Sequence, residues 1–87
     1  MKLKVTLTTK PGVLAIGSQI TLRKQPDNAF DDEAIEVLHE GKAVGYVAAY
    51  CKLRKPGTVS TGRLYDKITP VYNATVVADQ VAEVEVV

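Results

Sequence analysis

The residues best suited to chemistry in this chain lie in an acidic stretch that begins at Pro26. Asp31, Asp32 and Glu33 form a run of three carboxylates directly before the apolar segment 34–38. Carboxylates suit calcium or magnesium, but the residue spacing of a calcium-binding loop is absent. Neighbouring acids in a turn also cap backbone amides, and this structural role is the simpler interpretation of the run.

The chain contains one cysteine, Cys51, and one histidine, His39. Nucleophilic chemistry would require these two side chains to lie close together in space. Cys51 sits among alanine and leucine at helical spacing, which favours a buried, inert thiol, and His39 ends a strand, where an exposed side chain is expected. A structural zinc site needs about four ligands, mostly Cys and His, and a glycine-rich phosphate loop is missing. We therefore predict no catalytic residue, no metal and no cofactor, and thus a protein that is not an enzyme.

Basic and aromatic residues are interleaved along the chain, as they are in sites for single-stranded nucleic acid. The net charge is only +1, but two basic blocks, 1–24 and 46–68, flank the acidic block 25–45. If the basic blocks meet in space they form a positive face beside an acidic loop; solvated, scattered charges are the alternative. The aromatic residues are Phe30, Tyr46, Tyr50, Tyr65 and Tyr72, and the interleaved cations are Arg23, Lys24, Lys52, Arg54, Lys55 and Arg63.

The length of 87 residues predicts a single domain, 1–87, with one hydrophobic core. A lone cysteine excludes an intramolecular disulfide and fits a reducing compartment. No apolar run approaches the ~20 residues needed to span a bilayer, and the first ten residues lack the core of a signal peptide. We expect a soluble, cytoplasmic protein with no membrane partner.

Six segments carry the signals of β-strands, separated by turns such as Pro11-Gly12 and Gly41-Lys42. In the second of them Ile20 and Leu22 should point inward, and Thr21 and Arg23 outward. The last two segments could be two strands around 79–80 or one long bulged strand. The predicted strands are 2–9, 18–24, 34–39, 43–47, 72–78 and 81–87.

After the fourth predicted strand, the apolar residues are spaced as in a helix. Apolar residues at 47, 50, 51 and 53 fit two turns of helix, which Pro56-Gly57 ends. A further turn of helix near 63–67 is compatible with the less regular segment 58–68. The expected fold is therefore mostly β with a short α insertion: a small six-stranded OB-like or SH3-like β-barrel with one helix after the fourth strand.

The stretch 22–46 resembles a HIRAN domain, a module found at the N-terminus of certain SWI/SNF-type helicases and as a small stand-alone bacterial or phage protein. The family pattern is a strand ending in Leu-x-Arg/Lys, a P-x-N-x-aromatic-D loop, an A-I-x-V strand, a turn, and Val-Gly followed by an aromatic residue or His. The match covers about a quarter of the chain. It consists of Leu22-Arg23-Lys24, Pro26-Asp27-Asn28-Ala29-Phe30-Asp31, Ala34-Ile35-Glu36-Val37 and Val44-Gly45-Tyr46.

The resemblance implies an OB-like barrel that captures the 3′-hydroxyl end of single-stranded DNA, in DNA repair or replication. Asp31 matches the aspartate that hydrogen-bonds the terminal hydroxyl, Phe30 the aromatic before it, and Tyr46 the residue after the hairpin glycine. A carboxylate accepts a hydrogen bond from a sugar hydroxyl and repels a phosphate, so it distinguishes a free end from a phosphorylated one. The resulting candidate nucleic-acid-binding residues are Asp31, Phe30, Tyr46, Arg23, Lys24 and Lys52.

Two departures from the family pattern keep a second function open. The DNA-end binders stack the last base on aromatic residues at the end of the first strand, where this chain has Thr8-Thr9-Lys10, and Ala49 replaces a lysine of their helix, with Lys52 one turn later. Stacking contributes ~1–3 kcal/mol per base. Asp31 would then remain as the cap of its loop and Phe30 as a plug of the barrel.

The alternative function is that of a protein-interaction or accessory β-barrel module that has lost the DNA-end site. Its near-zero net charge and the threonines of the first strand favour this interpretation. The apolar run 81–87 could supply an exposed strand edge for a protein partner or a homodimer.

Overall fold

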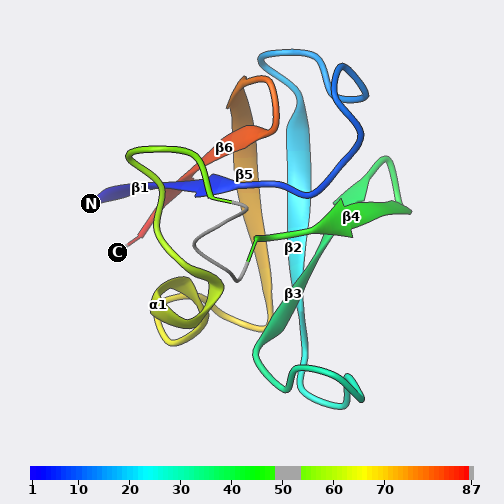
Figure 1. Cartoon of the computed structure of the whole chain (residues 1–87), viewed down its shortest axis with the longest axis vertical. Helices are drawn as coiled ribbons and strands as arrows, with labels where there is room; N and C mark the ends of the chain where they lie inside the picture. Colours follow the sequence, from blue (N-terminus) through cyan, green and yellow to red (C-terminus); the bar gives the residue numbers. More distant parts are fainter. Residues whose placement is uncertain (49–53, 87) are drawn as a thin grey trace.

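The structure, a computed structural model that describes residues 1–48 and 54–86, consists in that part of six strands and one short helix (Figure 1). All strand pairs are antiparallel, and the order across the single sheet is β1-β6-β5-β2-β3-β4. The mostly-β class with one short helix is confirmed. The elements are β1 (Lys2–Thr6), β2 (Gln19–Gln25), β3 (Ala34–His39), β4 (Lys42–Tyr46), α1 (Thr61–Tyr65), β5 (Val71–Ala78) and β6 (Val81–Glu85).

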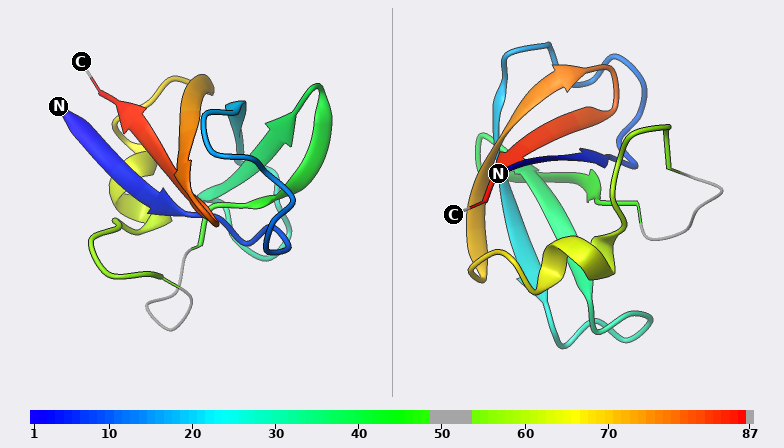
Figure 2. Two further views of the ribbon diagram at one scale, coloured as in Figure 1. Left: turned by 90° about the horizontal axis from the view of Figure 1, so that it is seen from above. Right: turned by 90° about the vertical axis from the view of Figure 1, so that its left-hand side faces the viewer.

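The sheet is open, because no strand ladder joins its outer strands β1 and β4 within the described residues. The chain just beyond these two strands does meet, through an isolated antiparallel bridge between Leu7 and Val47. On either side of this bridge, Thr8 N donates to the carbonyl of Tyr46 and Ala48 N to that of Thr6, each at 2.8 Å. A strongly twisted sheet thus brings its two ends together at one point (Figure 2), without the ladder of a closed barrel.

One face of the sheet forms the core, as the alternation of apolar residues predicts. Ile20 and Leu22 of β2 are buried as expected, and α1 covers this face with the fully buried Leu64. Ser60 caps α1 by accepting from Arg63 N, and Thr61 Oγ1 donates to the carbonyl of Val47. The core residues include Val5, Leu7, Ile20, Leu22, Ile35, Val37, Leu64, Val76, Ala82 and Val84.

Helix α1 corresponds to the turn of helix predicted near 63–67 and begins two residues earlier. The longer helix predicted for 47–54 falls largely on residues 49–53, which lie outside the described part of the chain, as do Tyr50, Cys51 and Lys52. Residue 47 takes part in the isolated bridge rather than in a helix.

The C-terminal segment forms two strands, which settles the choice between two strands and one bulged strand. Gln80 has a positive φ of 58° at the turn, and the register shifts between Val76 and Ala78. The prediction that 81–87 supplies an exposed edge is wrong for β6, because β6 pairs with β5 on one side and with β1 on the other. Long-range pairing decided this, since a strand's place in a sheet is not encoded in its own periodicity.

Candidate functional site

The loop between β2 and β3 is shaped by its own side chains. Asn28 Oδ1 accepts hydrogen bonds from the backbone N–H groups of Phe30, at 2.9 Å, and Asp31, at 3.1 Å. Asp31 Oδ1 in turn accepts from Glu33 N at 2.9 Å. Asn and Asp favour such turns because their short side chains reach amides two or three residues ahead. Asp31 therefore caps its loop, as the structural interpretation of the acidic run predicts.

Phe30 is the most exposed large apolar residue of the site, with 98% of its surface accessible. The alternative in which it plugs the barrel is wrong, because a side chain exposed to this extent packs against no core residue. Burying a phenylalanine side chain stabilises a fold by about 1.5–3 kcal/mol, and the chain forgoes that contribution here. A fully exposed aromatic ring on a loop with a fixed backbone is free to contact a ligand.

Arg23, Glu36 and Tyr46 form a row across β2, β3 and β4 on the face opposite the core. The strand register pairs Arg23 with Glu36 and Glu36 with Tyr46, and directly opposed residues point to the same side of a sheet. The Arg23 guanidinium makes an ion pair with the Glu36 carboxylate. Exposed fractions are 51% for the Arg23 side chain, 10% for that of Glu36 and 39% for Tyr46. The row thus has accessible ends and a covered carboxylate in its middle.

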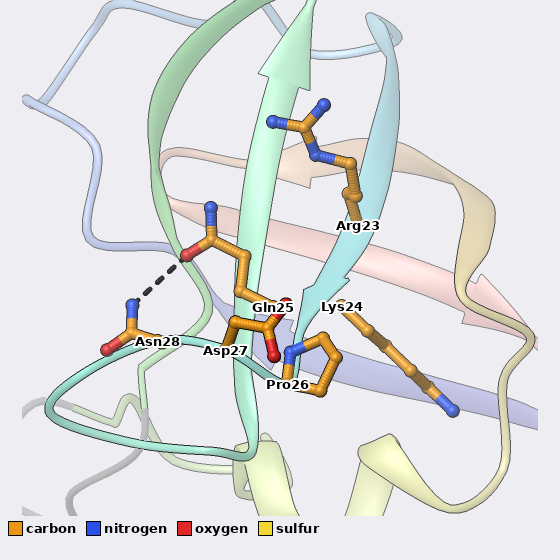
Figure 3. A pocket seen from close by; sticks show the side chains of 6 residues that line it. All are labelled: Arg23, Lys24, Gln25, Pro26, Asp27 and Asn28. Atoms are coloured by element: carbon orange, nitrogen blue, oxygen red, sulfur yellow. Dashed lines mark hydrogen bonds between the residues drawn. The ribbon is translucent and has the colours of Figure 1, made fainter.

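Gln25 and Asn28 connect this row to the loop. Gln25 lies two residues beyond Arg23, so its side chain leaves the same face of β2. Asn28 Nδ2 donates to Gln25 Oε1 at 3.1 Å, and Figure 3 shows the two side chains pointing toward one another. A continuous surface therefore runs from Tyr46 to Phe30. We call its five polar members, Tyr46, Glu36, Arg23, Gln25 and Asn28, the outer strip.

Lys24 is not part of the outer strip, although the sequence grouped it with Arg23. Its ammonium lies 4.4 Å from the centre of the Tyr65 ring in α1, close enough for a cation–π contact. An open pocket of about 420 Å³ is lined by residues 23–28, but Figure 3 shows the Arg23 and Lys24 side chains diverging. The pocket therefore does not direct both cations at one ligand. Lys52, the remaining predicted cation, is outside the described residues.

The backbone of Tyr46 is fixed by the end of the first strand. Thr8 Oγ1 donates to Tyr46 O and accepts from Tyr46 N, both at 3.1 Å. A Cβ atom on Gly45 would lie 3.1 Å from both Cγ2 and N of Thr9, a contact so tight that Thr9 would have to shift, so glycine favours the close approach of the two segments. The threonines that depart from the family pattern therefore lie directly beside Tyr46.

The two basic blocks of the sequence meet along β1. Val59 N donates to the carbonyl of Lys4 and Lys55 N to Thr6 Oγ1, both at 2.8 Å. Lys4 and Lys55 are exposed, and the Lys55 ammonium donates to the carbonyl of Asp79. The blocks are thus adjacent through their main chains at these two positions.

Sequence reasoning missed Glu36 and gave Asn28 and Thr8 no role in a site. Glu36 is the one charged residue in the apolar run 34–38, and a lone acid in a buried strand is a signal that could have revealed it. Asn28 was identified as a turn former, which is correct but incomplete. The role of Thr8 depends on a contact with a residue 38 positions away and leaves no trace in its local sequence.

The remaining candidate groups for metal or thiol chemistry are His39, Cys51 and the acidic side chains. Among residues 1–48 and 54–86 no group of three or more His, Cys, Asp and Glu side chains could hold a metal ion. His39 is half-buried rather than exposed, with Nε2 3.6 Å from Glu40 Oε1, and its possible partner Cys51 is outside the described residues. No helix in the described part of the chain has the length and apolar character to cross a membrane.

In comparisons with known proteins, no family model, no curated protein and no solved structure matches this chain.

Proposed function

We propose that this chain is a non-enzymatic, nucleic-acid-binding module of the HIRAN type, which binds the 3′-hydroxyl end of single-stranded DNA in repair or replication. The observation that carries the proposal is the 98% exposed Phe30 ring on a loop whose backbone is fixed by Asn28 and Asp31. The proposal includes an OB-like fold, for which the isolated bridge between Leu7 and Val47, at the two ends of the open sheet, is the support. It also includes a cytoplasmic location, for which the lone cysteine is the support.

Each part of the surface has a chemical task in this proposal. Phe30 and Tyr46 offer ring faces on which bases stack, a contact that is tolerant of sequence because every base has a π-face. Asp31 is half-buried beside Phe30, and its Oδ1 is used by Glu33 N. No hydrogen bond within the described residues engages Oδ2, so this oxygen can accept from a terminal sugar hydroxyl. A terminal phosphate there would be repelled.

Fluorescence anisotropy with a labelled ~10-nucleotide single strand tests the proposal. The strand ends in a 3′-hydroxyl or in a 3′-phosphate, and each is titrated at low and at moderate salt. We expect tighter binding of the hydroxyl end, by about tenfold, the order of one charge-assisted hydrogen bond gained in place of a repulsion. The preference should disappear in Asp31→Asn, which keeps an oxygen for Glu33 N but removes the negative charge.

Asp27→Asn is the matched control, because Asp27 is an exposed acid of the same loop and the change in net charge is identical. It should leave the preference for the hydroxyl end in place. Equal binding of both ends by the unchanged protein would reduce the site to a general basic surface. Undetectable binding at low salt would refute the proposal.

One observation favours the alternative of an interaction module. Ile16 is 73% exposed and Val13 is 48% exposed, on the loop between β1 and β2. That loop is anchored by Gly12 N donating to Asp79 Oδ1 and by Gly17 N donating to the carbonyl of Val76. A second copy of the chain is the partner that this version specifies. A concentration series by light scattering that shows only monomer would exclude it.

A further inference from the structure

We infer that Glu36 sets the specificity of the outer strip, by neutralising Arg23 so that the strip accepts bases and a free hydroxyl rather than phosphates. This inference rests on the proposed function and assigns a role to a residue outside the family's matched positions for DNA contact. Glu36 acts through Arg23: it positions the guanidinium and offsets its positive charge.

Glu36 is the only charged residue among the buried residues of the described chain. A buried carboxylate is costly unless it is paired and hydrogen-bonded, and removal of one partner leaves the other charge uncompensated. The Arg23 guanidinium supplies that pairing from the neighbouring strand. The ion pair with Glu36 therefore holds the Arg23 guanidinium against β3, on the face of the sheet opposite the core.

The charge of the row decides what it can bind. Arg23 remains half exposed, yet its positive charge is offset by a carboxylate in direct contact. A phosphate that approached Arg23 would also approach Glu36 and meet repulsion. A base meets no such penalty, because the flat guanidinium can stack on its ring and the amides of Gln25 and Asn28 can hydrogen-bond its edge. The outer strip is therefore suited to nucleobases, with the phosphate backbone directed elsewhere.

The test compares Glu36→Gln with Glu40→Gln in the anisotropy assay described above. Both variants lose one negative charge, but Glu40 is an exposed residue at the turn between β3 and β4, with an 82% accessible side chain. Glu36→Gln should bind the 3′-phosphate strand about tenfold more tightly, the order of one new charge-assisted contact. Its plot of log K against log salt should become steeper by about 0.7, the value for one added phosphate contact on a single strand. Glu40→Gln should change neither quantity.

A thermal melt shows whether Glu36→Gln folds. If it does not, the variant Arg23→Gln still tests the inference. Arg23→Gln should weaken binding, through lost stacking and through the carboxylate of Glu36 that it leaves uncompensated. It should leave the salt slope unchanged, because Arg23 makes no phosphate contact in the unmodified protein. A fall of about 0.7 in the salt slope of Arg23→Gln would overturn the inference.

The outcomes separate this inference from the proposed function. If the unmodified protein prefers the hydroxyl end and Glu36→Gln alters neither affinity nor salt slope, the inference alone fails. If Glu36→Gln and Glu40→Gln gain affinity equally, net charge explains the effect and the inference also fails. If only Glu36→Gln binds DNA, the proposed end recognition fails while the neutralising role of Glu36 is supported. If no protein binds, both are refuted.

Discussion

The two aromatic ends of the candidate surface are positioned in different ways. Phe30 owes its position to hydrogen bonds that Asn28 Oδ1 accepts from the backbone N–H groups two and three positions further on. Tyr46 owes its position to Thr8, which is 38 residues away in the chain, and to a glycine that permits the close approach of Thr9. One end is organised locally and the other by the tertiary fold.

Because of this difference, a substitution at the Phe30 end and one at the Tyr46 end should differ in their effect on the stability of the fold. The loop of Phe30 can be altered with little effect on the sheet, since its ring makes few contacts with the rest of the molecule. The backbone of Tyr46 lies where the two ends of the sheet meet, beside the Leu7–Val47 bridge. A change there should affect the whole fold. Substitutions at the Phe30 end should therefore weaken binding and leave stability unchanged. Substitutions at the Tyr46 end should lower stability.

The largest expected effect is on stability, at Gly45. Gly45→Ala introduces a Cβ 3.1 Å from the backbone nitrogen of Thr9, and this segment cannot shift freely because Thr8 is bonded to Tyr46. Overpacking of this kind should lower the free energy of unfolding by about 1–3 kcal/mol, measured by urea denaturation. Gly62→Ala is the control, because its Cβ would meet Glu33 Oε1 at an ordinary 3.5 Å within α1. A stable Gly45→Ala protein would show that the Tyr46 end is not coupled to the fold.

The next effect is on binding, at Phe30. Phe30→Ala should weaken binding of single-stranded DNA by about tenfold or more, because stacking on the ring is lost. The free energy of unfolding should change by less than about 0.5 kcal/mol, as is usual for an exposed side chain. Ile16→Ala, which removes another exposed apolar side chain from a different loop, should leave DNA binding unchanged. A large loss of stability in Phe30→Ala would contradict the local organisation of this end.

The smallest expected effect is on local unfolding, measured by amide hydrogen exchange. It distinguishes Thr8, which holds the backbone of Tyr46, from Asn28, which holds that of Phe30. Thr8→Val and Asn28→Ala each remove two hydrogen bonds to backbone groups, contributions of about 0.5–1.5 kcal/mol apiece. Amide hydrogen exchange should become faster only at Phe30 and Asp31 in Asn28→Ala. In Thr8→Val it should become faster at Tyr46 and across the contact between the sheet ends. The same exchange pattern in both variants would remove the distinction between the two ends.

Much of the local structure followed from the sequence. Alternation identified the strands and the inward positions of Ile20 and Leu22, because the period of side chains along a strand is fixed by the backbone. The loop of Asn28 and Asp31 was predictable for a related reason. A short polar side chain reaches only the amides next to it, so its bonding partners are written in the neighbouring sequence.

Other features required the folded chain. Periodicity assigns a residue to a face but does not say which strand lies beside it, so neither the interior place of β6 nor the pairing of Arg23 with Glu36 could be read in advance. The divergence of Lys24 toward Tyr65 and the support of Tyr46 by Thr8 have the same origin. The sequence determined the strands, the turns and the chemistry of the loop. The tertiary structure alone decided which of these side chains share a surface, because the order of strands in the sheet depends on packing between segments distant in the chain.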